Sequence, residues 1–152
     1  MKSKKRLFWC AVLIVCNIAF IWGNSLLPAE VSKAISGFVR DIVSAIFGGS
    51  GGADDAVVGE GILRKIAHFI EFTCLGSLLC WLFSMLQKHK LYALACGFLT
   101  ACVDETIQVF VPGRGPRVTD VLLDSVGVAC GIALLIAGYT IYQKKKNKFF
   151  GG

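Results

Sequence analysis

The chain has 152 residues, of which 55% are apolar and only 17% are charged. Ordinary soluble domains carry roughly 25% charged residues. A domain of this length cannot hide so much apolar surface in one core, because small domains leave a large share of their surface exposed. The composition therefore excludes a soluble enzyme and a disordered tail. The formal net charge is +6, so the places where the charges lie become informative.

Four apolar segments are long enough to cross a membrane, since a hydrocarbon core about 30 Å thick needs roughly 20 helical residues. They lie at about residues 7–23, 62–86, 91–111 and 118–142. Backbone groups in lipid must bond within their own segment, and the sequence lacks the alternation of membrane strands, so these segments are predicted to be helices. The expected fold is all-α: one polytopic membrane domain over residues 1–152 with four transmembrane helices.

The charges that flank these segments predict the orientation of the chain. The two terminal flanks and the turn between the second and third segments carry ten basic residues and no acidic residue: Lys2, Lys4, Lys5, Arg6, Lys88, Lys90, Lys144, Lys145, Lys146 and Lys148. The positive-inside rule places these flanks, and with them both termini, in the cytoplasm. The remaining 6 basic and 10 acidic residues give a net charge of −4, so the positive total reports topology and predicts no nucleic-acid partner. A cleaved signal peptide is the alternative for the first segment, but bulky Ile21 occupies a position where a cleavage site needs a small residue.

The long loop between the first and second segments has two parts. From about residue 29 to residue 47, apolar side chains recur at helical spacing with polar ones between them. This pattern predicts an amphipathic helix that lies in the outer membrane interface or packs on the rim of the bundle. The Gly-rich run at 48–52 and the acidic stretch up to Gly61 predict a flexible linker. The seven cysteines contain no Cys-x-x-Cys pair and are interpreted as small packing residues.

Ionisable residues inside three of the segments are costly in lipid and are candidates for function. Glu71, Asp104 and Asp124 come from different segments, and at 1.5 Å per residue they lie roughly 9–13 Å from the outer ends of their helices. This convergence predicts a polar pocket open to the outer side, and Gly127 and Gly131 would let the helices approach closely. The candidate catalytic residues are His68, Glu71, Asp104, Glu105, Gln108 and Asp120. The candidate substrate-binding residues are Arg64, Lys65, Arg114, Arg117 and Asp124.

Three stretches of the chain, in this order, resemble the VanZ-like family of small bacterial membrane proteins. They are RKIAHFIEF at 64–72, DETIQVFVPGR at 104–114 and DVLLDSVG at 120–127, together with Asn24, Ser25, Pro28 and Gly131. The resemblance adds Ser25 to the candidate substrate-binding residues and implies a multi-pass protein of the bacterial plasma membrane. The founding member of that family is associated with resistance to teicoplanin and related lipoglycopeptide antibiotics, and the family implies no settled reaction. Asp124 is a departure, since many members carry Asn there.

The first interpretation of the pocket is a lipid-phosphate site. Arg contacts phosphate with two donors at once, and a Gly-rich turn at the start of a helix exposes backbone N–H groups to an anion. Arg114 within Gly-Arg-Gly, with Arg64 and Lys65 opposite, can hold the headgroup of a polyprenyl phosphate such as undecaprenyl phosphate. The expected partners are therefore membrane lipids or a lipid-linked cell-wall precursor.

Two other interpretations stay open. In one, the pocket is an enzyme site for a lipid-linked phosphate, in which a divalent metal bound by His68, Glu71, Glu105 and Asp120, or Glu105 as a general base, drives the reaction. In the other, the charges form a purely structural network of ion pairs that fixes helix register. Transport is disfavoured, because four segments are few for a monomeric transporter.

Overall fold

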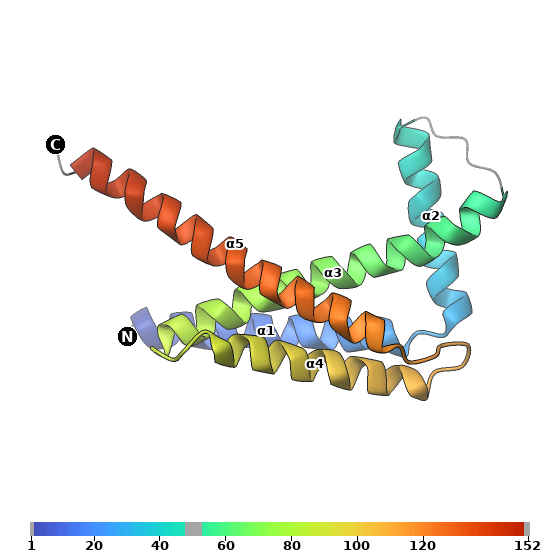
Figure 1. The fold of residues 1–152 in the computed structure, drawn as a ribbon, viewed down its shortest axis with the longest axis horizontal. Coiled ribbons are helices and arrows are strands. Elements are labelled where there is room, and N and C mark those ends of the chain that lie inside the picture. The colour runs from blue at the N-terminus through green and yellow to red at the C-terminus, as the bar shows by residue number, and fades with distance from the viewer. Residues whose placement is uncertain (1, 48–52, 151–152) are drawn as a thin grey trace.

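The computed structural model describes residues 2–47 and 53–150, which form five α-helices and no strand (Figure 1). The helices are α1 (Lys2–Leu26), α2 (Ala29–Phe47), α3 (Ala53–Met85), α4 (Leu91–Val109) and α5 (Val118–Phe150). Four of them run along the long axis, whereas α2 lies across one end, beside the α4–α5 loop (Figure 1). Both termini and the α3–α4 turn lie at the opposite end. The all-α prediction is therefore confirmed.

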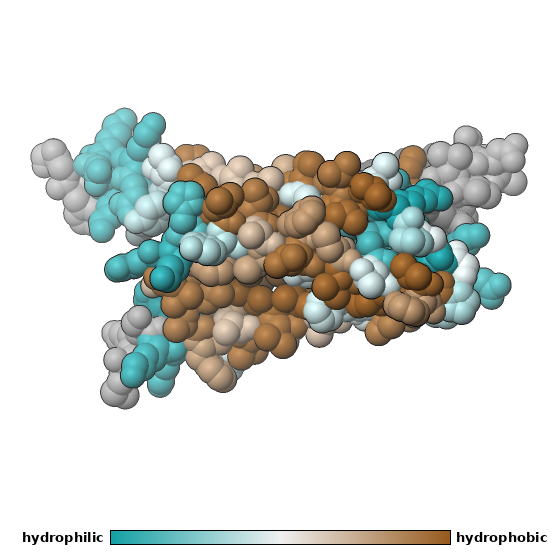
Figure 2. Space-filling view, turned by 60° about the horizontal axis from the view of Figure 1, so that its bottom comes forward, coloured by the Kyte–Doolittle hydropathy of each residue, from teal (hydrophilic) through white to brown (hydrophobic). Residues whose placement is uncertain are grey.

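Three of the described helices are long and apolar enough to cross a membrane, over Lys4–Leu26, Ile62–Met85 and Val118–Lys148. α4 has 19 residues and is not among them, because its last turns carry two acids and a glutamine. Large apolar side chains are exposed along the bundle, including Phe20 at 58% and Leu134 at 64%. Figure 2 shows a wide apolar belt between two hydrophilic ends. Such a belt fits contact with lipid rather than with water.

The helix boundaries differ from the sequence prediction at several ends. The amphipathic helix over residues 29–47 is confirmed as α2. The prediction of a flexible linker that reaches Gly61 is wrong from residue 53 onward, because α3 begins at Ala53. Residues 53–61 contain no proline and place acidic residues in the first turn, where the helix dipole favours negative charge. The Gly-rich part of that linker, residues 48–52, lies outside the described residues.

α3 and α5 share the most extensive contact between described helices, and they meet at glycines. A Cβ on Gly131 would collide with the carbonyl oxygen of Thr73, and one on Gly127 would lie 2.9 Å from the carbonyl oxygen of Phe69. Ser77 Oγ donates a hydrogen bond of 3.0 Å to the Gly131 carbonyl. Small residues at the crossing therefore bring the two backbones into contact, as predicted for Gly127 and Gly131.

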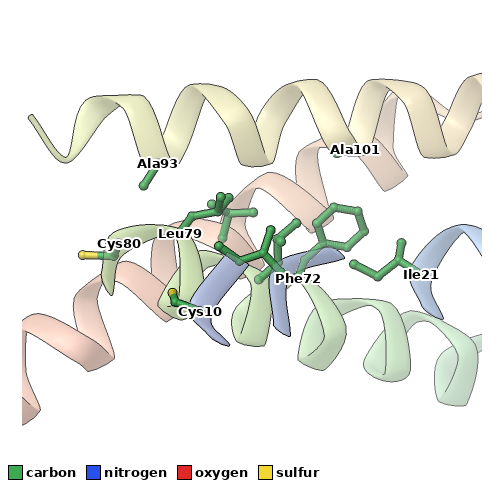
Figure 3. Close-up of a cluster of buried hydrophobic side chains, with 10 residues drawn as sticks. Cys10, Ile21, Phe72, Leu79, Cys80, Ala93 and Ala101 are labelled. Atoms are coloured by element: carbon green, nitrogen blue, oxygen red, sulfur yellow. The ribbon is translucent and has the colours of Figure 1, made fainter. Parts of the chain in front are cut away.

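An apolar core fills the middle of the bundle beside this crossing (Figure 3). Its buried members come from α1, α3, α4 and α5: Cys10, Ile14, Ile21, Phe72, Leu75, Leu79, Cys80, Ala93, Ala101 and Val128. Figure 3 shows Phe72 and Ile21 at one end of the cluster and Cys80 and Ala93 at the other. The polar residues begin next to Phe72, so the core closes the inner side of the site.

Candidate functional site

The polar side chains of α1, α3, α4 and α5 meet at the end of the bundle that α2 crosses. Hydrogen bonds, ion pairs and shared cavity walls connect every candidate residue predicted from the sequence. These residues are Ser25, Arg64, Lys65, His68, Glu71, Asp104, Glu105, Gln108, Arg114, Arg117, Asp120 and Asp124.

The α4–α5 loop turns the side chain of Arg114 back toward the end of α1. Gly113 has φ +76°, a left-handed conformation that glycine adopts without a steric penalty. The Arg114 N–H then donates to the Val111 carbonyl at 3.1 Å, which closes the turn. As a result, Arg114 Nη2 donates a 3.1 Å hydrogen bond to the carbonyl oxygen of Asn24.

Asp104 is the buried centre of the site and is 0% exposed. Its Oδ2 accepts hydrogen bonds from Ser25 Oγ at 2.8 Å and from Gln108 Nε2 at 3.0 Å. His68 Nδ1 lies 3.9 Å from the same oxygen, which is too long for a hydrogen bond. The second oxygen, Oδ1, is buried and has no hydrogen-bond partner among the described residues.

Glu105 ties α4 to the start of α5. Its Oε2 accepts a 2.8 Å hydrogen bond from the backbone N–H of Arg117, and its Oε1 accepts one of 3.2 Å from Gln108 Nε2. Both oxygens are thus engaged. The side chain of Arg117 is exposed, so this residue contributes its backbone N–H to the site.

Two further polar contacts bound the cluster. Glu71 Oε1 accepts a 2.8 Å hydrogen bond from Asn24 Nδ2, which joins α3 to the end of α1. Lys65 Nζ lies 3.2 Å from Asp120 Oδ1, at the more exposed edge of the site. These contacts fix how α1, α3 and α5 meet at this end of the bundle.

Arg114 carries donors that the described residues leave unused. Its Nε and Nη1 are buried without a hydrogen-bond partner among them. Burial, and then the neighbouring Arg64, lower the pKa of the Arg114 guanidinium from its ordinary value. An arginine still stays charged at neutral pH. Arg114 therefore presents a positive charge with free donors.

A cavity of about 180 Å³ lies between α2, α3 and the end of α1. Its polar wall is formed by Asn24, Ser32, Ser36, Arg64, His68, Glu71 and Arg114, and its apolar wall by Leu27, Ile35, Val39, Leu63 and Ala67. A second void of about 10 Å³ lies between α3, α4 and α5, and Arg64 and His68 line both spaces. The larger cavity has room for a small polar headgroup.

Three polar residues of the cavity wall, Asn24, Ser32 and Ser36, are not among the site residues predicted from the sequence. Asn24 was noted only as part of a motif, because nothing in the sequence reveals that it bonds Glu71 from a helix 47 positions away. Ser32 and Ser36 both lie on α2, and Ser36 is one of the polar positions of its amphipathic pattern. Their i, i+4 spacing, which puts both on one face, was the available signal.

Among the described residues, one group could hold a metal ion: His68, Asp104 and Asp124. One imidazole nitrogen and one oxygen of each carboxylate lie within 4.8 Å of one another. The ligand set predicted from the sequence shares only His68 with this group. Its other members have different partners: Glu71 bonds Asn24, Glu105 bonds Arg117 and Asp120 pairs with Lys65.

Comparison with known proteins identifies one family. The model of the VanZ/LLP1 family matches residues 7–141, a stretch that holds every candidate site residue. No curated protein and no solved structure matches the chain.

Proposed function

The chain belongs to the VanZ/LLP1 family, and on that premise we propose that its polar pocket binds the phosphate-bearing headgroup of a lipid-linked cell-envelope molecule. A polyprenyl phosphate such as undecaprenyl phosphate has the required chemistry, with an anionic head and a hydrocarbon tail that stays in the membrane. Binding or remodelling this lipid in the bacterial plasma membrane would alter the response to lipoglycopeptide antibiotics, as the resemblance to VanZ-like proteins implies.

The proposal includes four membrane crossings, by α1, α3, α4 and α5. A helix of 19 residues is roughly 28 Å long, close to the thickness of a hydrocarbon core. The acids and the glutamine of α4 are buried, whereas Phe98, Leu99 and Val103 are exposed. α4 therefore offers lipid an apolar surface although its last turns carry polar residues.

The same proposal puts both termini in the cytoplasm and the site on the outer side. The basic flanks and the α3–α4 turn, which carries Lys88 and Lys90, lie at the end of the bundle opposite α2 (Figure 1). Cytoplasmic loops carry an excess of lysine and arginine. The pocket under α2 would then face the outer leaflet, where lipid-linked precursors are used.

The observation that carries the proposal is the pair of unused Arg114 donors beside the 180 Å³ cavity. A buried donor without a partner costs about 1–3 kcal/mol. A phosphate can accept a charge-assisted hydrogen bond from Nη1 or from Nε, which lie on opposite edges of the guanidinium, and bonds of this kind are about twice as strong as neutral ones. Arg64 on the same wall adds positive charge, and the apolar side of the cavity, with Ile35 and Val39, suits the first carbons of the tail.

The direct test is lipid binding by the purified full chain, measured by native mass spectrometry in detergent micelles. Arg114→Gln should weaken binding of undecaprenyl phosphate by about 10- to 100-fold, since charged hydrogen bonds contribute about 1.5–3 kcal/mol. Arg117→Gln is the matched control, because only the backbone of Arg117 is used. Undecaprenol, which lacks phosphate, should bind weakly to all three proteins. Equal binding by wild type and Arg114→Gln, or of both lipids, would refute the proposal.

Phosphoryl hydrolysis or transfer in the same pocket is a second candidate function. It is favoured by the buried acids Asp104 and Glu105 and by His68, which lies on the cavity wall. The test is release of inorganic phosphate from undecaprenyl phosphate or its pyrophosphate, with Mg²⁺, Mn²⁺ or Zn²⁺ added. Release that is abolished by Glu105→Gln supports the enzyme. Lipid binding without release under any of these ions contradicts it.

A further inference from the structure

Two buried carboxylates and an imidazole face one another inside the bundle. His68 comes from α3, Asp104 from α4 and Asp124 from α5, and their ligand atoms lie within 4.8 Å of one another. Asp104 is 0% exposed and Asp124 is 2% exposed. The two carboxylates are therefore buried, whereas His68, whose side chain is 12% exposed, also lines the larger cavity.

Such a group needs a cation or a shared proton. Two adjacent carboxylates in a low-dielectric interior repel each other, and buried charges persist only when paired. Lys65 is engaged by Asp120 at the edge of the site. The contact between His68 and Asp104 is too long for a hydrogen bond. Among the described residues, Asp104 and Asp124 at the centre of the site thus lack a close ion pair such as the one between Lys65 and Asp120 at its edge.

A second and independent observation points to a ligand at this place. Asp104 Oδ1 and His68 Nδ1 are both buried without a hydrogen-bond partner among the described residues. Asp104 Oδ2, by contrast, accepts from both Ser25 and Gln108. These two donors hold the carboxylate in one orientation and leave Oδ1 available, as outer partners of metal-binding carboxylates commonly do.

We propose that His68, Asp104 and Asp124 bind one divalent transition-metal ion, of the class of Zn²⁺ or Mn²⁺. The two carboxylates match its charge. One imidazole nitrogen with carboxylate oxygens suits these ions, whereas Mg²⁺ and Ca²⁺ prefer oxygen ligands alone. Ligands at about 2.0–2.2 Å from an ion stand at most about 4.4 Å apart, so small side-chain rotations close the site. The metal site stands independently of the proposed lipid.

The test is metal retention by the purified full chain in detergent. The protein is stripped with EDTA, incubated with Zn²⁺, Mn²⁺ or Mg²⁺, and desalted, and the metal is quantified by mass spectrometry. We expect about one Zn²⁺ or Mn²⁺ per chain, little Mg²⁺, and a raised midpoint of thermal unfolding, because a ligand that binds only the folded state stabilises it. His68→Gln and Asp104→Asn should weaken binding by more than about 100-fold, beyond the effect typical of outer partners.

His89→Gln is the matched control. It removes the chain's other histidine, which lies in the α3–α4 turn, where its Nδ1 accepts a hydrogen bond from the backbone N–H of Leu91. It should keep the ion. Asp104→Asn alters the contacts of Ser25 and Gln108, so His68→Gln, whose unfolding midpoint without metal is measured as a check of folding, provides the second variant.

The outcomes separate this inference from the lipid proposal. No retained metal, or equal retention by wild type and folded His68→Gln, overturns the metal site. Loss of the ion in His89→Gln with retention in His68→Gln overturns it as well. Metal binding without phosphate-lipid binding rejects only the proposed function, and lipid binding without metal rejects only the metal site.

Discussion

Gly131 allows α5 to touch the backbone of α3, and Gly131→Ala tests how much stability depends on that contact. The added Cβ would collide with the Thr73 carbonyl oxygen and lie 2.8 Å from the Ser77 nitrogen. Both are backbone atoms that cannot rotate away, so the helices must move apart. Overpacking of this kind costs about 1–3 kcal/mol, and the better helix propensity of alanine returns at most about 1 kcal/mol. We expect a net loss of about 1–2 kcal/mol in the free energy of unfolding.

Gly138 supplies the control on the same helix. A Cβ there meets no atom within 4 Å, so Gly138→Ala should leave stability unchanged or raise it by up to about 1 kcal/mol. The assay is reversible unfolding of the full chain in mixed micelles by added sodium dodecyl sulfate, followed by far-UV circular dichroism. Equal midpoints for the two variants, or a Gly131→Ala midpoint at or above wild type, would refute the proposed close packing.

The remaining predictions concern the site and the topology. Ser25→Ala removes the 2.8 Å hydrogen bond to buried Asp104 and should lower the free energy of unfolding by about 1–3 kcal/mol. Ser84→Ala, on an exposed residue whose hydroxyl bonds its own helix, should cost less than about 0.5 kcal/mol, and similar losses would contradict the assigned role of Ser25. Green fluorescent protein fused after Gly152 should fluoresce and alkaline phosphatase fused there should be inactive, because the proposed topology puts the basic C-terminal flank in the cytoplasm; the reverse pattern rejects the topology.

Much of the fold follows from patterns within single segments. Apolar runs and helical spacing predicted every described helix, and for α2 the bounds matched, because apolar side chains that recur every three to four residues indicate a helix. The start of α3 was missed, since the acidic residues from Asp54 onward have the composition of a linker as well as of a helix start. Local sequence alone does not separate the two.

The site was predicted as a set of residues, but its pairings were not. His68 and Glu71 share one face of α3, so the sequence put them together as metal ligands. In the structure Glu71 bonds Asn24, while His68 faces Asp104 and Asp124. Residues three positions apart on a helix are offset around its axis, and the neighbouring helices decide which partner each one meets. That information is held in the packing of α1, α4 and α5 and not in the spacing.

The first turn of α5 is capped by a residue of another helix. In a capping box, an acid at the third helical position accepts a hydrogen bond from the N–H of the residue before the helix. In α5 that position is Asp120, which pairs with Lys65, and Glu105 of α4 accepts from Arg117 in its place. The cap at the start of α5 is thus supplied by a residue of α4. A chimaera that takes α5 alone from a relative separates this helix from the α4 acid that caps it. A chimaera that takes residues 91–150 transfers the helix and its cap together.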